Sequence, residues 1–476
     1  MGIIGTAAVV FLTIIVLALS IILIAPDGVY DLVNPLPPVE KSFPFKPAFW
    51  RIAGRDEEPD NEIYPFKINI PEEDLTDLQL RLNRSRFVAP IVGVKFTYGF
   101  NPTVLRKIVD YWKSEYNWKK HEASLNEFPH YKTKIEGLNI HYVHAKPRIL
   151  EKNTKIYPVI MLHGWPGSFF EFWKVFPELL KPRKLPSGRS VACEVIVPSL
   201  PGFGFSDASE IPGMTMADMS RIFAKLMERL GFKKYFVHGL DWGVAIGRFQ
   251  SIMYPKNVLG LSVTIYLLLP NAPFFLKSAL GMLAPSLVVS PGEERKLIFK
   301  HIMWQLGDSG FAYIHGTKPD SVTAAMSDSP AGLAAWIMDK QVSQTRHYEN
   351  IYKDDGGLHE YFDLNDLLTN VMLYWWTNTI GTSARIYKEN CGYFGCEPAD
   401  QIRYRYIVPV PAVLTDFRDE APGIQPPDDF AKRIFPKAVS FAKHSGGHFM
   451  GLENPKELSE DIWLLVTHVA SALLKQ

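Results

Sequence analysis

A short motif, Gly239-Leu240-Asp241-Trp242-Gly243, places a carboxylate between two glycines directly after an apolar run of strand character. Such a motif is typical of a sharp strand-to-helix turn, in which the glycines let the backbone cross closely and the central residue is strained. Esterases and lipases place serine at that position, whereas here it is Asp241. A carboxylate there can attack a carbon electrophile and form an ester, which a base-activated water then hydrolyses. Taken alone, the motif also fits an ordinary turn with an exposed aspartate.

A second group of residues, near the end of the chain, could activate that water. His448 lies in Ser445-Gly446-Gly447-His448-Phe449, and a histidine on a Gly-rich loop can reach across a sheet. The chain order nucleophile, acid, histidine then requires a carboxylate between Asp241 and His448. Three carboxylates follow the strand that ends near residue 414: Asp416, Asp419 and Glu420. Spacing alone does not choose among them. A structural role for His448 is the competing interpretation, and neighbouring His444 is the residue most easily confused with it.

A third motif could stabilise negative charge. His163-Gly164-Trp165-Pro166-Gly167 follows a strand that ends near Leu162 and precedes a helix. Its Gly-rich turn can aim a backbone N–H at the reacting centre, and Trp242, just after Asp241, can supply a second. Together the two donors would form an oxyanion hole.

These motifs need a sheet that brings them to one edge, and the hydrophobic pattern predicts one. Strands are expected at residues 131–135, 138–144, 157–162, 194–197, 235–239, 259–266, 407–414 and 437–441. Helices are expected at 168–180, 216–230 and 454–474. This alternation predicts an open, mostly parallel α/β sheet. Residues 271–400 are helical and aromatic instead, and we interpret them as a lid inserted between two parts of the core, 131–270 and 401–476.

The N-terminal part carries a membrane signal. Residues 3–25 form an uncharged run of 23 residues, long enough at about 1.5 Å per residue to cross a hydrocarbon core of roughly 30 Å. We interpret residues 1–25 as a transmembrane anchor, with a signal peptide as the competing interpretation. Lys41, Lys46 and Arg51 slightly favour a cytoplasmic catalytic domain. Residues 26–130 are expected to form an extended segment and helices, near 71–82 and 102–116, that pack on the core.

The composition narrows the remaining possibilities. A formal charge of +1 over 476 residues does not indicate a nucleic-acid partner. The three cysteines, Cys193, Cys391 and Cys396, favour neither a disulfide framework nor a zinc site. The chemistry described above requires no metal and no organic cofactor.

Four motifs together resemble those of the microsomal-type epoxide hydrolases, which include the insect juvenile hormone epoxide hydrolases. They are the three motifs around His163, Asp241 and His448, and Pro198-Ser199-Leu200-Pro201-Gly202-Phe203-Gly204-Phe205-Ser206. The resemblance extends essentially from end to end, including the anchor and the paired N-terminal helices. It implies an α/β-hydrolase fold, with Asp241 as the nucleophile and His448 as the base.

The resemblance also implies which groups support these two. The backbone N–H groups of Trp165 and Trp242 would hold the oxyanion. In the family the acid lies ten residues beyond a Val-Pro pair, which counted from Val410-Pro411 selects Glu420, with Asp416 in reserve.

Two lid tyrosines of the family donate hydrogen bonds to the epoxide oxygen. One matches Tyr387 in Arg385-Ile386-Tyr387-Lys388-Glu389-Asn390. The other should follow Ser309-Gly310, but this chain has Phe311 there, and its nearest tyrosine is Tyr313. Either Tyr313 turns inward as a second donor, or one phenol works alone, or activity is weak.

The function expected from the resemblance is that of an epoxide hydrolase anchored in the endoplasmic reticulum membrane. It would convert lipophilic epoxides and water to vicinal diols through an ester on Asp241. The alternative is a weakly active or inactive membrane-anchored binder of lipophilic epoxides. A haloalkane dehalogenase would share Asp241 and the fold, but Tyr387 and the anchor disfavour it. The sequence does not distinguish a terpenoid hormone, a fatty-acid epoxide and a xenobiotic as substrate.

Overall fold

A computed structural model describes residues 35–52, 60–148, 151–265, 281, 284–292, 307–390, 403–419 and 427–474. The predicted anchor at residues 1–25 and the predicted acid Glu420 lie outside these ranges. Within these ranges, no helix combines the length and the apolar character that a membrane span needs.

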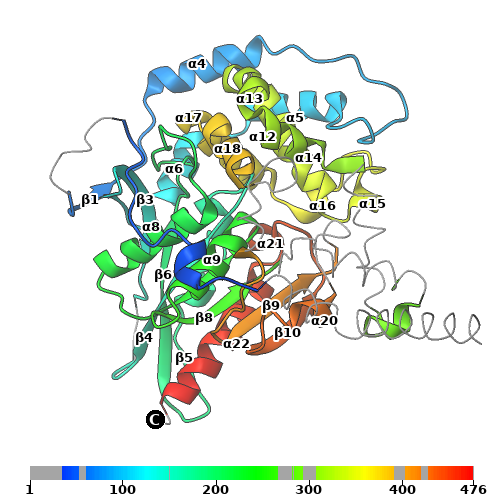
Figure 1. Cartoon of the computed structure of the whole chain (residues 1–476). Helices are drawn as coiled ribbons and strands as arrows, with labels where there is room; N and C mark the ends of the chain where they lie inside the picture. Colours follow the sequence, from blue (N-terminus) through cyan, green and yellow to red (C-terminus); the bar gives the residue numbers. More distant parts are fainter. Residues whose placement is uncertain are drawn as a thin grey trace, which may run out of the picture.

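A mostly parallel sheet forms the centre of the molecule (Figure 1). Its described strands are β1 (Ile63–Phe66), β2 (His130–Ile135), β3 (Leu138–Ala145), β4 (Lys155–Leu162), β5 (Arg183–Lys184), β6 (Ser190–Pro198), β7 (Tyr235–Gly239), β8 (Val258–Val263), β9 (Ala412–Phe417) and β10 (Ala438–His444). The strand order is β1-β2-β3-β6-β4-β7-β8-β9-β10, and β5 pairs with β6. From β6 to β10 every step along this order is parallel, whereas β1, β2 and β3 are antiparallel additions at one edge. Parallel strands place their carboxyl ends at one edge, where ligands of open α/β sheets bind.

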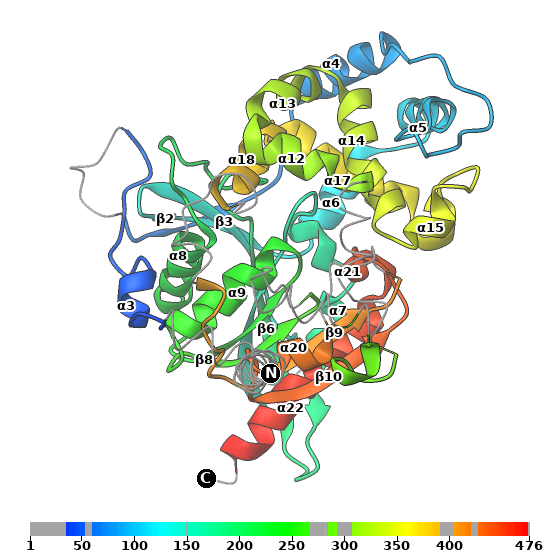
Figure 2. The same ribbon diagram turned by 45° about the vertical axis from the view of Figure 1, so that its right-hand side comes forward.

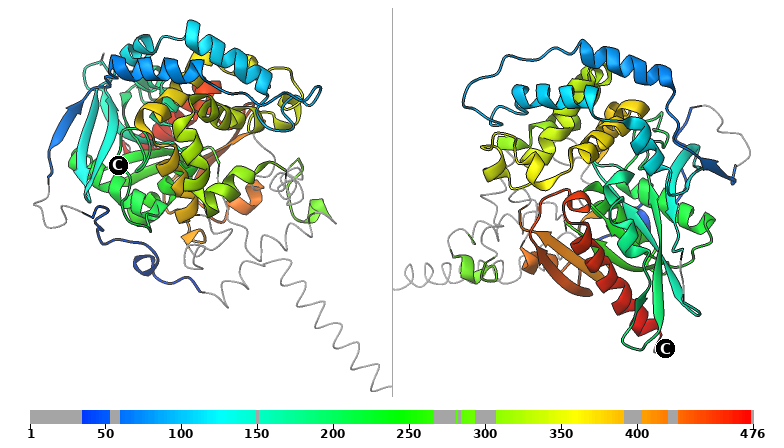
Figure 3. Two further views of the ribbon diagram at one scale, coloured as in Figure 1. Left: turned by 90° about the horizontal axis from the view of Figure 1, so that it is seen from above. Right: turned by 180° about the vertical axis from the view of Figure 1, so that it is seen from behind.

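Helices cover both faces of this sheet. On one face α8 (Met216–Arg229) packs on α9 (Trp242–Met253), which contacts β4, β7 and β8. The other face is covered by α7 (Phe176–Leu179) and α22 (Pro455–Leu473), and the view from behind brings α22 to the front (Figure 3). Strands β6 and β7, in the parallel part of the sheet, are buried along their whole length because helices cover both faces of the sheet.

Two of the expected elements differ markedly in the structure, and strands β1 and β5 were not expected at all. The helix expected at 168–180 is divided into a 3₁₀ turn, η1 (Phe169–Phe172), and the short α7. Pro177 is the reason, because proline lacks an N–H and is tolerated only in the first turn of a helix, which is where α7 holds it. The strand expected at 407–414 begins at Ala412 and continues to Phe417.

The described residues between β8 and β9 contain no strand and are mostly helical. The helices of eight or more residues are α12 (Gly310–Thr317), α13 (Pro319–Asp328), α14 (Pro330–Ser343), α17 (Leu364–Thr377) and α18 (Ile380–Asn390). The shorter ones are η2 (Pro285–Leu287), α15 (His347–Asn350) and α16 (Leu358–Tyr361). We keep the name lid for this part of the chain, whose predicted limits, 271 and 400, stay a prediction.

The N-terminal helices contact the lid, which the sequence analysis did not anticipate when it placed them on the core. Helices α4 (Glu72–Asn83) and α5 (Pro102–Ser114) pack against each other and against α14, at the top of Figure 1. The physical reason is that each has one apolar face, which α14 helps to bury. The segment expected to be extended also contains a short helix, α3 (Val39–Ser42), which lies beside α8 (Figure 2). The remaining helices are α6 (Trp118–Leu125), α20 (Asp428–Ala431) and α21 (Met450–Glu453).

Candidate active site

Asp241 lies on the turn that joins β7 to α9, as the motif predicted. Its backbone has φ 47° and ψ −121°, a left-handed conformation that is strained for a residue with a side chain. Such strain costs about 1–3 kcal/mol and persists only when the surroundings enforce it. Gly243 shows how they do so, because a Cβ there would overlap the carbonyl oxygen of Leu162 at the end of β4. The helix therefore starts in contact with the neighbouring strand.

The Asp241 carboxylate is held by two backbone donors. The N–H of Trp165 donates to Asp241 Oδ1 over 2.7 Å, and the N–H of Trp242 also bonds the carboxylate. Burial raises the pKa of Asp241, while the nearby His448 and the two N–H groups act in the opposite direction and do not fully offset it. The structure thus brings together Asp241, Trp165 and Trp242 as the sequence analysis expected.

His448 faces the other carboxylate oxygen. Its Nε2 lies 3.6 Å from Asp241 Oδ2, and its side chain is buried. Carboxylates hold the loop that carries it. Glu453 accepts hydrogen bonds from the N–H groups of Gly447 and Phe449, each over 2.9 Å, and Asp419 accepts one from Gly446 over 2.9 Å. The loop is therefore fixed on both sides of the histidine.

The alternative histidine, His444, has a different partner. Its Nε2 lies 2.9 Å from Oδ2 of Asp461 on α22, which also accepts a hydrogen bond from Thr415. A hydrogen bond between a strand and the helix that covers it is a structural interaction. His448, and not His444, is thus the histidine that faces Asp241.

The three candidate acids are placed differently. Asp416 is buried near the end of β9. Asp419 is engaged by the loop around His448 and by Arg346, whose Nη2 lies 3.2 Å from Asp419 Oδ2. Glu420 lies outside the described residues, so its choice as the acid stays a prediction.

Residues 163–167 carry the predicted oxyanion donor Trp165, and we call them the oxyanion turn. Helix α17 of the lid holds this turn by hydrogen bonds. Tyr374 donates its hydroxyl hydrogen to the Gly167 carbonyl over 2.7 Å, and Asn370 Nδ2 donates to the Pro166 carbonyl over 2.8 Å. Asn370 also accepts from Ser168 Oγ over 2.8 Å. Neither side chain was identified from the sequence, because no local motif links residues about 200 positions apart. The lid thereby positions the Trp165 N–H.

Aromatic rings from two lid helices pack around the Trp165 side chain. Tyr387, on α18, has its ring centroid 4.8 Å from that of Trp242 and 5.7 Å from that of Trp165. Phe311, on α12, stacks on Trp165 with centroids 5.5 Å apart. Tyr313 is two residues further, about 200° around the helix, and is only half-buried. The structure therefore packs Tyr387 and Phe311 against Trp165, whereas helical spacing puts Tyr313 on another face of α12.

Comparison with known proteins decides the family. Residues 63–172 match the model described as Epoxide hydrolase N terminus, and residues 157–282 match alpha/beta hydrolase fold. The chain is 40% identical to Juvenile hormone epoxide hydrolase 1 of Ctenocephalides felis, covering 88% of each chain. It is 38% identical to Epoxide hydrolase 1 of Oryctolagus cuniculus, covering 89% of this chain and 93% of that one. The chain belongs to the epoxide hydrolase family. A solved structure, juvenile hormone epoxide hydrolase from the silkworm Bombyx mori, matches with a TM-score of 0.83 at 36% identity, covering 90% of this chain and 99% of that one.

This epoxide hydrolase also contains two buried glutamates near His448 that the sequence analysis missed. Glu171 follows the oxyanion turn, on η1, and burial raises its pKa to about 8. Glu453 is on α21, and burial raises its pKa to about 7. Both carboxyls are close enough to His448 for its charge to lower their pKa values in part. Only the packing of α21 against η1 shows this, because neither glutamate stands in a recognisable motif.

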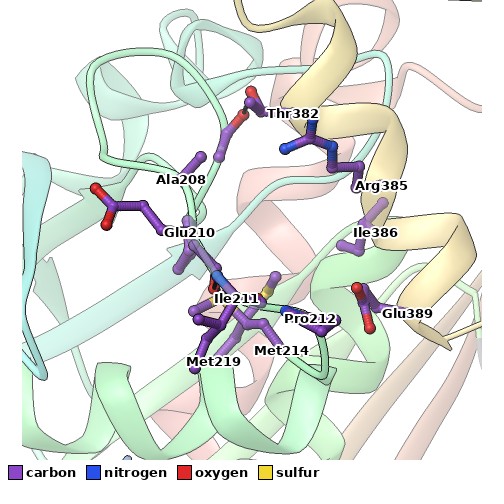
Figure 4. Close-up of a pocket in the computed structure, with 13 residues that line it drawn as sticks. Ala208, Glu210, Ile211, Pro212, Met214, Met219, Thr382, Arg385, Ile386 and Glu389 are labelled. Carbon is purple, nitrogen blue, oxygen red and sulfur yellow. Dashed lines mark hydrogen bonds between the residues drawn. The ribbon is translucent and has the colours of Figure 1, made fainter. Parts of the chain in front are cut away.

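A hollow of about 230 Å³ lies between α18, the helix that carries Tyr387, and residues 201–214 (Figure 4). Its lining residues on α18 are Thr382, Arg385, Ile386 and Glu389, which share one face of the helix. Neither Tyr387 nor Asp241 lines it. The hollow is therefore separate from the candidate catalytic residues Asp241 and Tyr387.

Proposed function

We propose that the protein converts lipophilic epoxides to vicinal diols through a covalent ester on Asp241. The observation that carries this proposal is the division of the Asp241 carboxylate between two sets of partners. Oδ1 accepts the Trp165 N–H over 2.7 Å, while Oδ2 lies 3.6 Å from His448 Nε2. Oδ1 is held by a backbone donor, and Oδ2, on the side of His448, is the oxygen that would attack the epoxide.

In the first step Asp241 Oδ2 attacks an epoxide carbon, and the bond from that carbon to the ring oxygen breaks. The ring oxygen becomes an alkoxide, which Tyr387 stabilises by donating its phenolic hydrogen. The product of this step is an ester between the substrate and Asp241.

In the second step His448, oriented by the acid proposed at Glu420, takes a proton from water. The resulting hydroxide attacks Cγ of Asp241, and Oδ1 becomes the oxyanion in reach of the Trp165 and Trp242 N–H groups. Collapse breaks the bond from Cγ to Oδ2, the proton on His448 passes to Oδ2, and the diol leaves with Oδ2 as its new oxygen. The carboxylic acid formed at Asp241 then loses its own proton, which restores the phenol of Tyr387. Water replaces that oxygen in the carboxylate, so epoxide plus water gives diol.

Single turnover in heavy-oxygen water tests this route. The diol from the first turnover is expected to be unlabelled, with the label in Asp241, because water attacks the ester carbonyl and not the epoxide carbon. His448→Gln is expected to trap the ester, visible as a mass increase equal to the epoxide. Label in the diol of the first turnover would show direct hydrolysis. Binding of epoxides without diol formation would favour the alternative, a binder.

We further propose that residues 3–25 anchor the enzyme in the endoplasmic reticulum membrane, with the catalytic domain on the cytoplasmic side. The absence of charge in this run and the basic residues Lys41, Lys46 and Arg51 support this. A membrane location suits lipophilic substrates, and the names of relatives point to juvenile hormone as one to test first. A panel of terpenoid, fatty-acid and aryl epoxides would identify the preferred class.

A further inference from the structure

His315 is a fully buried polar side chain in the wall of rings over the active site. It lies one helical turn after Phe311 on α12, so the two side chains share a face. Its ring centroid is 4.6 Å from that of Trp165, 5.1 Å from that of Tyr387 and 6.1 Å from that of Phe311. It therefore contacts the phenol-bearing ring and the oxyanion-hole tryptophan together.

One hydrogen bond determines which ring nitrogen carries the proton. Trp336 Nε1 lies 3.2 Å from His315 Nε2, and an indole N–H can only donate. His315 Nε2 must therefore be the acceptor, which leaves the hydrogen of the neutral ring on Nδ1. Burial, with a contribution from the nearby Lys340, lowers the pKa of His315 to about 3 and keeps the ring neutral.

The Nδ1–H group has no hydrogen-bond partner among the residues that the structure describes, although it is buried. An unpaired buried donor is destabilising, because it has given up its hydrogen bonds to water, and it therefore calls for an explanation. One explanation is that the Nδ1–H donates to an oxygen of the substrate, so that its hydrogen bond forms only when substrate is bound.

We propose that His315 donates its Nδ1–H to the epoxide oxygen beside Tyr387, in place of the phenol that Phe311 lacks. This inference rests on the proposed function and deepens it. The donor has moved by one helical turn, from position 311 to position 315, and stays on the face of α12 that packs on Trp165 and Tyr387. Tyr313, two residues from Phe311, does not share that face.

The role of the imidazole is limited to hydrogen bonding. A neutral imidazole is a much weaker acid than a phenol, so His315 keeps its hydrogen and only spreads the charge of the alkoxide. The proton that the alkoxide finally gains comes from Tyr387. Other enzymes use a neutral histidine in this way to polarise a substrate oxygen.

The test measures ring opening by itself. In the His448→Gln background the ester accumulates, so its rate of formation reports the first step alone, followed by the mass of the protein with styrene oxide and a terpenoid epoxide. Adding His315→Leu is expected to slow ester formation about a hundredfold, as loss of one well-placed donor does. His315→Gln keeps an N–H donor of similar size and is expected to stay within about tenfold of the parent.

Two further variants separate this role from a structural one. Phe311→Tyr added to His315→Leu is expected to recover ester formation, because it restores a phenol at the position where the family has one. With His448 present, the turnover rate divided by the fraction of enzyme held as ester gives the rate of ester hydrolysis. His315→Leu is expected to leave this rate unchanged, since that step does not involve the epoxide oxygen. If the leucine variant does not fold, His315→Met provides the same test with an unbranched apolar side chain.

The outcomes are distinguishable. Unchanged ester formation in His315→Leu, with an active parent, would overturn the role of His315 and leave the proposed function intact. Equal slowing of ring opening and ester hydrolysis would show a structural role and also overturn it. No ester formation in the parent with either epoxide would overturn the proposed function itself, and the inference with it.

Discussion

Tyr387 is the lid phenol whose ring packs against both Trp242 and Trp165. We expect Tyr387→Phe to lower kcat/KM about a hundred- to a thousandfold, because loss of one donor removes about 2.7–4 kcal/mol of transition-state stabilisation. Steady-state diol formation measures this.

Tyr313→Phe is the matched control for this prediction, since it removes a phenol from the same helix as Phe311 but from another face. We expect it to have little effect. Equal damage from Tyr313→Phe and Tyr387→Phe would show that the second donor is Tyr313 after all.

Glu171 is a buried acid whose pKa is raised to about 8. Its pKa in the unfolded chain is near 4.5, so between these values the folded state holds a proton that unfolding releases. Stability from this group is therefore present below about pH 4.5 and is lost as pH rises toward 8. Glu171→Gln mimics the protonated form, so its melting temperature relative to wild type should increase from pH 5 to pH 8 and level off above.

Melting curves at pH 5, 6.5, 8 and 9 check the sign of this effect. A relative melting temperature that falls with rising pH would mean that ionised Glu171 is stabilised in the folded protein, with His448 as the nearby cation. The comparison uses wild type and variant at each pH, so that titration of all other groups cancels to first order.

At the scale of elements, the contact between α9 and β4 determines the backbone geometry of Asp241, the proposed nucleophile. A Cβ at Gly243 would overlap the Leu162 carbonyl oxygen, and the backbone cannot move without displacing Asp241. We expect Gly243→Ala to abolish diol formation and to lower the melting temperature. Gly310→Ala, at the start of α12, meets no atom within 4 Å and is expected to be neutral or slightly stabilising. Normal activity in Gly243→Ala would contradict this account of the turn.

The lid and the core act as one unit because helix α17 supplies hydrogen bonds to the oxyanion turn. Tyr374 and Asn370 satisfy the Gly167 and Pro166 carbonyls, so the position of the Trp165 N–H depends on a helix encoded about 200 residues later. Through this connection the insertion between β8 and β9 helps to position the Trp165 N–H, although it adds no strand among the described residues.

At the scale of the whole molecule, glycosylation of Asn83 reports the side of the membrane on which the catalytic domain lies. Asn83-Arg84-Ser85 is a glycosylation sequon, and Asn83 is exposed at the end of α4. We expect no glycan on Asn83 when the full chain is expressed in cells with an endoplasmic reticulum, because the proposed orientation leaves the domain in the cytoplasm. Treatment with a glycan-removing enzyme and electrophoresis measure this, and a mobility shift that Asn83→Gln abolishes would place the domain in the lumen.

The sequence by itself determined the parts of this protein that depend on local sterics and on the order of elements. The Gly-x-Asp-x-Gly motif predicts that Asp241 lies on the turn between a strand and a helix, because only small flanking residues allow the two backbone segments to cross so closely. Alternating apolar segments were sufficient to predict a mostly parallel sheet. The motif around His163 was sufficient to predict a backbone donor near Asp241.

Only the tertiary structure decided which distant groups complete the site. His444 and His448 are four residues apart in the sequence. In the structure His444 bonds Asp461 on α22, whereas His448 faces Asp241. The burial that raises the pKa values of Glu171 and Glu453 arises where α21 meets η1. The nearest tyrosine in the sequence, Tyr313, lies two residues beyond Phe311. In the helix that the structure shows, His315 shares the face of Phe311 and Tyr313 does not. In each case the deciding contact joins residues that are far apart in the chain or related by a helical turn, and its energy depends on what each residue is packed against.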